Sequence, residues 1–596
     1  MLLSINQIDL ESVPFSRRSS YMMFLSETRK DETGNEQKII YFAFSNGLSR
    51  GITRYDLIRV DPLFQGQILP FTYTASPGLL TMETLAGKIE ICFDGGTTVL
   101  FRTSGGLGLR FFIKYQSHEN FLDRLDGTVY ASFKYIGEFL FECTHGSLTH
   151  NGKWNGPKMM PEPNHVDYLA GDGGRAEGYI HFEQSSVDRP DHINPFDSCV
   201  QETREDYEKW CKKYPEVPEK YAGARLLAIY VIWINYAAPM GQIHGDIEYM
   251  MRCGNLVRAM GWHAGYQAMA ACLDIGTVVK LLYSLFRYQD EYGQIPDGVN
   301  DVFCDMHCTK PPFQGFAFEY IVNHGGLDQF TREHCELLYE PFKKWLSWWQ
   351  NFRDIDSNGL IDYVHADESG WDDSSVFHRG MPIETPDIHA FLILLMEALS
   401  KMAGKLGMRA EAEEWMARSR ELLETTIRTF WNGEKFIARL VGSREIVDTE
   451  TIAMYQPIIL GKRLPREIID KLAARIDNEE TFLTEGGLTS ESKKSPFYTI
   501  GTAFMLGRVL APVQLMMAVG FFNAGKKQLA GKIAAAFCDY VLEKGLITLK
   551  RQEDLPVNEP NAIVPPPIPG NAFSSWGASV FLVLSRLLVE CNTPDN

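Results

Sequence analysis

The chain has 596 residues and a formal net charge of −18, so it is too long for one small core, and its charge disfavours binding to a nucleic-acid backbone. A hydrophobic share of 45% and a charged share of 22% are typical of globular proteins. We therefore expect two domains, one of them large, and a neutral or cationic ligand rather than a nucleic acid.

The cysteines and the apolar runs indicate in which cellular compartment the protein is expected. The eleven cysteines are odd in number and lack ligand spacing, which indicates free thiols in a reducing compartment. Residues 1–20 lack a basic start followed by an apolar core, so we expect no signal peptide. The most apolar long run, Ala503–Phe522, contains Arg508 and Pro512 and is better explained as a buried helix than as a membrane span. We predict a cytoplasmic protein without a membrane partner.

Residues 1–190 predict an antiparallel β-sandwich domain. Short runs rich in β-branched and aromatic residues recur at intervals of about ten residues, and Gly, Asn and Asp clusters separate them. The expected strands include Lys38–Phe44, Gln67–Thr74, Lys88–Phe93, Thr98–Thr103 and Leu109–Tyr115.

Residues 191–218 predict a polar, proline-containing linker, and residues 219–596 predict an all-α domain. Helical spacing of apolar residues begins with Tyr221–Ala238. Roughly a dozen helices suit six hairpins closed into an (α/α)6 barrel, and no fixed-period repeat favours a solenoid. The other expected helices are Ala264–Cys272, Thr277–Tyr288, Gln314–Val322, Cys335–Phe352, Asp387–Leu406, Ala410–Phe430, Arg466–Ile476, Gly501–Phe521, Gly525–Glu543 and Asn571–Glu590.

Long loops between these helices carry most of the residues with chemical potential. One of them, Asp354–Ser375, holds seven carboxyl groups without a helical or strand period, as expected of a segment at a surface or cavity. Within it Trp371 precedes Asp372, and such a pair can stack on a sugar ring and protonate a glycosidic oxygen. An isolated Trp-Asp pair is more often a cap or turn, so the surrounding motifs decide its meaning.

A series of motifs, in order through nearly the whole helical half, resembles glycoside hydrolase family 63 and related (α/α)6 glycosidases, which include trehalases. The motifs are Met260-Gly-Trp-His-Ala264, Asp290-Glu-Tyr-Gly-Gln-Ile-Pro296, Thr309-Lys-Pro-Pro-Phe-Gln-Gly315, Asp354-x-Asp-x-Asn-Gly359, Glu368-Ser-Gly-Trp-Asp-Asp-Ser374, Glu384-Thr-Pro-Asp387, Glu485-Gly-Gly-Leu-Thr-Ser490, Gly507-x4-Pro-Val-Gln514, Asn558-Glu-Pro-Asn561 and Phe573-Ser-Ser-Trp-Gly577.

The resemblance implies an inverting, exo-acting α-glycosidase, α-glucosidase-like, that hydrolyses a small oligosaccharide or glycoconjugate and requires no cofactor. It implies that Asp372 is the general acid and Glu559 the general base. Asp373 is an alternative for the acid, and Glu553 and Asp554 are alternatives for the base. Inversion requires the two carboxyl groups to lie about 6.5–9.5 Å apart, so that a water molecule fits between the base and the anomeric carbon of the sugar.

Further residues of these motifs are candidates for substrate binding. Trp262, Trp371 and Trp576 are expected to stack on sugar rings, with core packing as the alternative. Gln314 and His263 are candidates for hydrogen bonds to hydroxyl groups, or else serve as a cap and a structural histidine. Glu368 and Asp373 are expected near the acid, where negative charge would raise its pKa.

Two motifs differ from the family pattern. Trp262-His263 stands where relatives have Trp-Asp, and Leu506-Gly-Arg-Val-Leu-Ala-Pro512 replaces Arg-Gly-Pro-x-Trp-Pro-Pro. We expect a substrate other than trehalose or the N-glycan precursor.

A calcium-like motif overlaps the acidic loop. Asp354, Asp356, Asn358 and Asp362 have the spacing of the first half of a calcium loop. The bidentate Glu of position twelve is absent, because His365 stands there. A structural calcium ion and a metal-free turn both remain open, and the missing Glu favours the turn. No His/Cys constellation in the sequence predicts a catalytic metal.

Two other classes of function remain open. An inverting glycoside phosphorylase has a similar architecture but replaces the base carboxylate with a phosphate site. A non-catalytic carbohydrate-binding protein would bind sugars without turnover. The sequence predicts a carbohydrate ligand in every case and does not reveal the oligomeric state.

Overall fold

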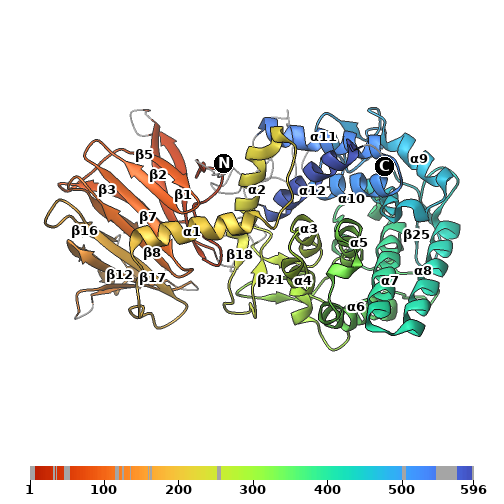
Figure 1. Ribbon diagram of the computed structural model, residues 1–596, viewed down its shortest axis with the longest axis horizontal. Helices are drawn as coiled ribbons and strands as arrows, with labels where there is room; N and C mark the ends of the chain where they lie inside the picture. The colour runs from red at the N-terminus through yellow and green to blue at the C-terminus, as the bar shows by residue number, and fades with distance from the viewer. Residues whose placement is uncertain are drawn as a thin grey trace.

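The computed structural model describes residues 7–30, 34, 36–45, 54–113, 120–123, 126–133, 136–158, 160–161, 164–251, 257–499, 505–544 and 574–593. Antiparallel sheets form the N-terminal part, and mostly helices form the C-terminal part. Figure 1 shows the two parts side by side, with helix α1 (Phe196–Cys211) lying at their junction. The expected order of a β region followed by a helical region is confirmed.

Two antiparallel sheets make up the N-terminal part, in the orders β1-β2-β3-β9-β16-β13, with β4 paired to β3, and β10-β11-β12-β17-β8-β7-β6-β5. Their strands are β1 (Met22–Lys30), β2 (Glu36–Phe44), β3 (Arg54–Phe64), β4 (Gln67–Ile68), β5 (Thr72–Ser76), β6 (Leu79–Glu83), β7 (Lys88–Asp94), β8 (Thr98–Thr103), β9 (Gly108–Ile113), β10 (Asn120–Asp123), β11 (Val129–Phe133), β12 (Gly137–His145), β13 (Ser147–His150), β16 (Asn164–Leu169) and β17 (Glu177–Glu183). A separate pair is formed by β14 (Trp154–Asn155) and β15 (Met160–Pro161).

The two sheets pack through phenylalanines on their facing sides. Phe42 of β2 lies 5.8 Å from Phe139 of β12, between ring centroids, and Phe44 lies 4.4 Å from Phe182. Alternation along each strand directs these rings inward. The burial of their apolar surface is the main favourable contribution to the folding free energy of the N-terminal part. The expected strand Gln67–Thr74 is divided into β4 and β5, because Pro70 between them has no amide hydrogen for a sheet ladder.

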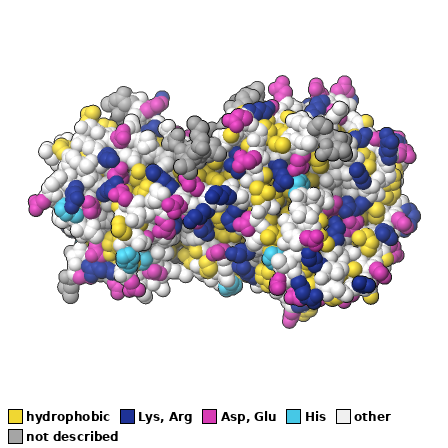
Figure 2. All heavy atoms as spheres, viewed as in Figure 1, with side chains coloured by type: hydrophobic (Ala, Val, Ile, Leu, Met, Phe, Trp, Pro, Cys, Tyr) yellow, Lys and Arg dark blue, Asp and Glu magenta, His cyan; other side chains and the backbone are white. Residues whose placement is uncertain are grey.

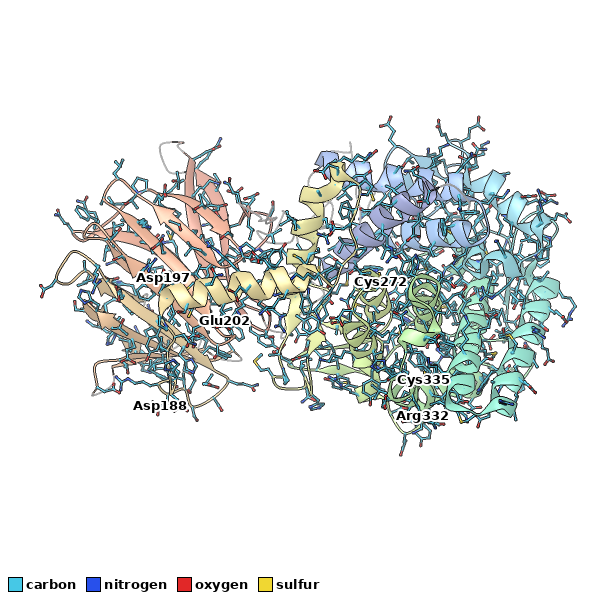
Figure 3. All side chains as sticks on the ribbon, in the orientation of Figure 1. Asp188, Asp197, Glu202, Cys272, Arg332 and Cys335 are labelled. Atoms are coloured by element: carbon cyan, nitrogen blue, oxygen red, sulfur yellow. The ribbon has the colours of Figure 1, made fainter. Side chains whose placement is uncertain are left out.

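Helix α1 occupies much of the segment 191–218 that the sequence predicts as a linker. Two ion pairs with exposed acids link it to the N-terminal part: Arg17 Nη2, in the segment before β1, lies 3.0 Å from Glu202 Oε1, and Arg102 Nη2 of β8 lies 3.0 Å from Asp197 Oδ1. Figure 3 shows Asp197 and Glu202 along this helix. The segment between the two parts therefore contains a helix.

The other end of α1 contacts the helical part. Asp206 accepts hydrogen bonds from Arg18 Nη2 at 2.7 Å and from Trp233 Nε1 of helix α2 (Ala222–Asn235) at 2.9 Å. A cavity of about 260 Å³ lies here, lined among others by Lys209, Trp210 and Lys280. Figure 2 shows Lys and Arg side chains gathered near the middle of the molecule, where the two parts meet.

Ten further helices follow α2 within the described ranges. They are α3 (His263–Ala270), α4 (Ile275–Tyr283), α5 (Gln314–Gly325), α6 (Arg332–Phe352), α7 (Pro386–Leu406), α8 (Arg409–Phe430), α9 (Arg466–Ile476), α10 (Ala511–Asn523), α11 (Lys527–Lys544) and α12 (Ser575–Cys591). Short pairings of β18–β28 connect the loops at their ends: β18 (Tyr236–Ala237), β19 (Ile247–Glu248), β20 (Ala259–Met260), β21 (Gly298–Val299), β22 (Cys304–Asp305), β23 (Asp362–Tyr363), β24 (Ile383–Glu384), β25 (Ala438–Leu440), β26 (Ile446–Val447), β27 (Leu483–Thr484) and β28 (Gly487–Leu488).

Helices distant in sequence meet around a common core. Helix α12 packs against α2 and α3 as well as against α10 and α11. Helix α10 begins at Ala511, ten residues later than predicted, because Pro512 is tolerated only in the first turn of a helix. Most of α10 is buried, as expected of this apolar run. No helix in the part of the chain that the structure describes combines the length and apolarity needed to cross a membrane.

The contact between α5 and α7 yields a stability prediction. A Cβ atom at Gly315 would lie 2.4 Å from the backbone nitrogen of Leu395, whereas a Cβ at Gly223 in α2 would meet nothing within 4 Å. Gly315→Ala should therefore cost about 1–3 kcal/mol through overpacking, while Gly223→Ala should be neutral or stabilising by up to about 1 kcal/mol. Both residues are the second residue of their helix, so the effect of alanine on helix propensity should be similar at the two positions. The difference between the thermal midpoints of the two variants therefore reports the packing effect. Equal midpoints would contradict it.

Candidate active site

The acidic loop is held in shape by serine hydroxyl groups. Ser369 Oγ donates to the Ala366 carbonyl at 2.6 Å and accepts from the Trp371 amide at 2.9 Å. Ser374 shares a hydrogen bond of 2.8 Å with Thr451, and Ser375 donates to Glu491 Oε2 at 2.8 Å. Asp372 thus lies on a loop that is fixed on both sides.

Gly370 permits this loop to approach the Trp262 ring. Its φ is +74°, and a Cβ atom there would lie 2.3 Å from Cη2 of Trp262. Only glycine meets both demands at low cost. The close approach places Trp371 against Trp262, with ring centroids 5.7 Å apart and planes at 78°.

The three candidate tryptophans belong to one buried aromatic cluster. Trp262 lies 5.8 Å from Trp576 and 6.1 Å from Tyr266, measured between ring centroids. Trp262, Trp371 and Trp576 are only 2%, 2% and 4% exposed. Trp262 therefore contacts the other two rings, and the three rings have little open face for a sugar.

His263 and Gln314 lie in the same cluster. The His263 ring is 4.0 Å from Trp576, and neither of its nitrogens has a hydrogen-bond partner within the described ranges. Burial, reinforced by the charges of Lys310 and Arg258, lowers its pKa well below the usual value, so the ring is neutral. Gln314 Nε2 donates to the Gly261 carbonyl at 3.2 Å and so supports the segment that carries Trp262.

The two adjacent aspartates of the loop have different surroundings. Asp373 Oδ1 accepts a hydrogen bond of 2.6 Å from the Met505 amide and so connects two loops. Asp372 is exposed and, among the described residues, its carboxyl group bonds only to its own amide. Although the side chain reaches solvent, the surrounding protein displaces much of the water around the carboxyl group, and this desolvation raises the pKa of Asp372 to about 6. The charge of Lys310 opposes this rise, and the charges of Asp367 and Asp297 add to it. Asp372 is therefore the carboxyl group that is free to transfer a proton.

Lys310 connects the acidic loop to the preceding loop. Its Nζ donates to the Asp367 carbonyl at 2.5 Å and lies 3.3 Å from Asp297 Oδ1. Burial alone would lower its pKa, but Asp297 and Asp372 outweigh that effect and raise the pKa, so Lys310 is a cation. Arg258 Nη1 lies 3.5 Å from the other oxygen of Asp297.

Glu368 is engaged in a structural ion pair. It is 1% exposed, and its Oε1 accepts from Arg353 Nε at 2.8 Å and Nη2 at 2.5 Å. Its Oε2 accepts from the Val364 amide at 3.1 Å. Both oxygens are committed to the loop, so Glu368 is not positioned to bind a hydroxyl group of a substrate.

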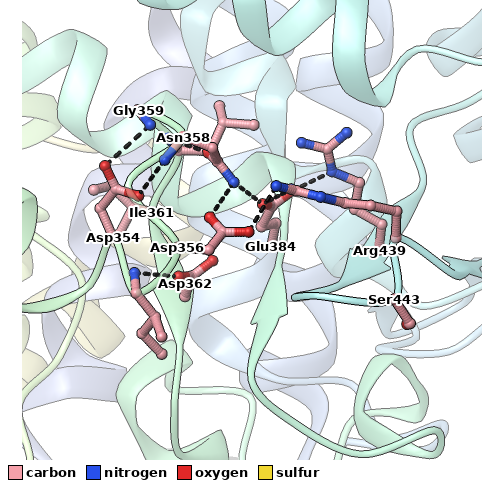
Figure 4. A network of polar contacts seen from close by, with 12 residues as sticks. Asp354, Asp356, Asn358, Gly359, Ile361, Asp362, Glu384, Arg439 and Ser443 are labelled. Atoms are coloured by element: carbon pink, nitrogen blue, oxygen red, sulfur yellow. Dashed lines mark hydrogen bonds and ion pairs between the residues drawn. The ribbon is translucent and has the colours of Figure 1, made fainter.

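The calcium-like segment closes on itself, as Figure 4 shows. The Asp354 oxygens accept from the amides of Asn358 at 2.9 Å and Gly359 at 3.0 Å. Asn358 Nδ2 donates to Asp356 at 2.5 Å and to Glu384 at 2.6 Å. Asp362 Oδ2 accepts from the Ile355 amide at 2.8 Å.

Two arginines neutralise this segment. Arg439 Nε donates to the fully buried Glu384, and Arg444 lies 2.5 Å from Glu384 and 2.6 Å from Asp356. Burial raises the pKa of Asp362 to about 6, and nearby acids add to the shift. Only Asp362 Oδ1 is buried without a partner among the described residues of the motif. Asp356 is paired with a guanidinium group, and Asp354 and Asp362 accept hydrogen bonds from backbone amides, so the contacts favour a metal-free turn over a calcium ion.

Several residues around Asp372 were not singled out from the sequence. Lys310, Asp297 and Glu491 lie in the quoted motifs or beside them, but no spacing rule relates a lysine to an acid 62 residues later. The expected base, Glu559, and its alternatives Glu553 and Asp554 lie outside the described residues.

Comparisons with known proteins match this part of the chain. Residues 257–547 match the family described as mannosylglycerate hydrolase MGH1-like glycoside hydrolase domain. The periplasmic trehalase of Salmonella newport (strain SL254) is 22% identical over 404 residues, which cover 58% of this chain and 64% of the trehalase. The chain thus spans somewhat less than two thirds of the length of the curated relatives it matches.

Solved structures are similar as well. The GH63 mannosylglycerate hydrolase of Thermus thermophilus, in complex with glucose, is 21% identical, with a TM-score of 0.48 over 60% of this chain and 99% of that chain. A bacterial glucoamylase in complex with acarbose is 10% identical, with a TM-score of 0.54 over 99% of this chain and 95% of that chain. The glucoamylase likeness concerns the fold alone.

The arginine-neutralised segment predicts independence from calcium. Treatment of the protein with EDTA should leave its thermal midpoint unchanged, whereas Arg439→Met should cost about 2–4 kcal/mol, because Glu384 loses a buried partner. Arg379→Met, which removes an exposed pair with Glu445, should change stability by less than about 1 kcal/mol. A midpoint that falls with EDTA and recovers with added calcium would contradict the prediction.

Proposed function

We propose that the protein is an inverting, exo-acting α-glycosidase, because residues 257–547 match a mannosylglycerate hydrolase MGH1-like glycoside hydrolase domain and the chain is similar to trehalases. The proposed substrate is a small α-linked glucoside or mannoside. The observation that carries this proposal is the state of Asp372: it is solvent-accessible, its pKa is raised to about 6, and its neighbours Glu368 and Asp373 are committed to structural contacts.

In the proposed mechanism, protonated Asp372 gives its proton to the glycosidic oxygen as the bond to the anomeric carbon breaks. Glu559 takes a proton from the water that attacks the opposite face, so the product has the inverted configuration. The assignment of Glu559 as the general base rests on the resemblance to the family. Lys310 acts as a positioning residue, because it holds the loop of Asp372 through the Asp367 carbonyl and tunes the acid through its charge.

We infer that the helices close into an (α/α)6 barrel. The contacts of α12 with α2 and α3 support closure, since they join the last described helix to the first helices of this part. Trp576 at the start of α12 and Trp371 beside Asp372 both contact Trp262, so the start of α12 and the loop of Asp372 lie close together in the helical part.

We also propose a cytoplasmic location and a carbohydrate as the only ligand that turnover requires. The ten cysteines among the described residues are all free thiols, which supports a reducing compartment.

Asp372→Asn and Glu559→Gln should each lower kcat by at least about 10²-fold, because each removes one of the two proton transfers. The measurement is proton NMR of the anomeric region during incubation with α-glucosides, α-mannosides and α-galactosides, including trehalose and mannosylglycerate, with and without phosphate. We expect β-anomer as the first product in the absence of phosphate. A sugar phosphate as product would identify a phosphorylase, and binding without turnover on the whole panel would favour a carbohydrate-binding protein.

The rate should fall as pH rises through about 6, because Asp372 must be protonated to act as the acid. Lys310→Met removes a positive charge that favours the carboxylate, so this descending limb should move to higher pH, by on the order of one unit. Lys213→Met, which removes a lysine paired with Asp274 at the domain junction, should leave the limb in place. A limb unchanged by Lys310→Met, in a variant with an unaltered circular dichroism spectrum, would exclude Asp372 as the titrating group.

A further inference from the structure

A group of soft and borderline metal ligands lies at the edge of the candidate active site. Ligand atoms of Cys308, His365 and Asp367 all lie within 4.8 Å of one another. Cys308 follows β22, and the other two residues begin the short 3-10 turn Ala366–Ser369, for which His365 is the N-cap. The residues are 57 positions apart in sequence, so spacing alone could not reveal the group.

The geometry of the turn prepares two of these ligands. The Asp367 amide donates to His365 Nδ1 at 3.2 Å, so this nitrogen carries a lone pair rather than a proton in that contact. The same nitrogen lies 3.8 Å from Asp367 Oδ2. Ligand atoms that share a tetrahedral zinc ion at bond lengths of about 2.0–2.3 Å lie roughly 3.3–3.6 Å apart. If a metal bond replaces the hydrogen bond from the Asp367 amide to His365 Nδ1, a small side-chain rotation would bring both atoms to one ion.

A second histidine lies next to this group. The ring of His307 is 6.3 Å from that of His365, between centroids, and the two planes meet at 68°. His307 is exposed and directly precedes the buried Cys308. Its side chain can therefore turn toward the group, which would then offer one sulfur, two nitrogens and one carboxylate oxygen.

We propose that Cys308, His365 and Asp367, with His307 as fourth ligand, bind a zinc-like transition-metal ion. The sulfur and imidazole donors select zinc or cobalt over calcium and magnesium. Binding releases the thiol proton of Cys308 to solvent, and the thiolate forms the bond to the metal. The ion would cross-link the turn Ala366–Ser369 to the loop of Cys308. The contact between Lys310 Nζ and the Asp367 carbonyl already connects the same two segments. The proposed metal site can be tested separately from the proposed hydrolysis, because metal binding is measured without a sugar substrate.

The test is titration of the full-length, chelator-treated and desalted protein with Co²⁺, followed by competition with Zn²⁺ against a chromophoric chelator. We expect one ion per chain and the near-ultraviolet charge-transfer band of a cobalt–thiolate bond. Cys308→Ser should abolish the band, and Cys308→Ser, His365→Asn and His307→Asn should each weaken Zn²⁺ binding at least tenfold.

Cys304→Ser is the matched control, since Cys304 is half-buried on β22, four residues before Cys308, and lies outside the group. It should retain both the band and the affinity. Cys308→Ala tests the same ligand without a hydroxyl group, and thermal unfolding of each metal-free variant identifies any that fails to fold. Unchanged binding in folded Cys308 and His365 variants, or loss of the band in Cys304→Ser, would overturn the site. Unchanged binding in His307→Asn would overturn its four-ligand form.

Discussion

The position of Asp372 depends on one buried cation. Lys310 is 7% exposed, and its ammonium group contacts both the Asp297 carboxylate and the Asp367 carbonyl. A charge removed from water requires such partners, and their attraction mainly offsets the cost of burial rather than adding much stability. The consequence is geometric: two loops that follow different helices are fixed to one atom, and the acid lies five residues beyond the second contact.

The aromatic cluster supplies the rigid support on the other side of that loop. Trp262 packs edge to face with Trp371 and at a tilt against Trp576, and Gly370 has no Cβ to collide with the Trp262 ring. Flat side chains with few rotatable bonds lose little conformational entropy when they are ordered. A loop that contains only short strands and 3-10 turns can thereby hold a carboxyl group in one place.

The sequence predicts regular elements well where local rules decide them. Thr98–Thr103 and Arg466–Ile476 are found with the predicted limits, since alternation and helical periodicity are uninterrupted there. Helix α1 was not predicted, because its polar surface resembles a linker and prolines flank it. The resemblance points to the loop of Asp372, but the distinction between Asp372 and Asp373 depends on the Met505 amide, 132 residues away. Tertiary contacts of this kind have no local signal.

The packing of α12 determines the order in which the helical part can be completed. Apolar faces of α2 and α3 are covered by a helix that is synthesised more than three hundred residues after α2. Closing so long a loop is slow compared with forming adjacent hairpins. During translation these faces therefore stay uncovered until α12 has left the ribosome, and until then the nascent chain exposes apolar surface that is prone to aggregation.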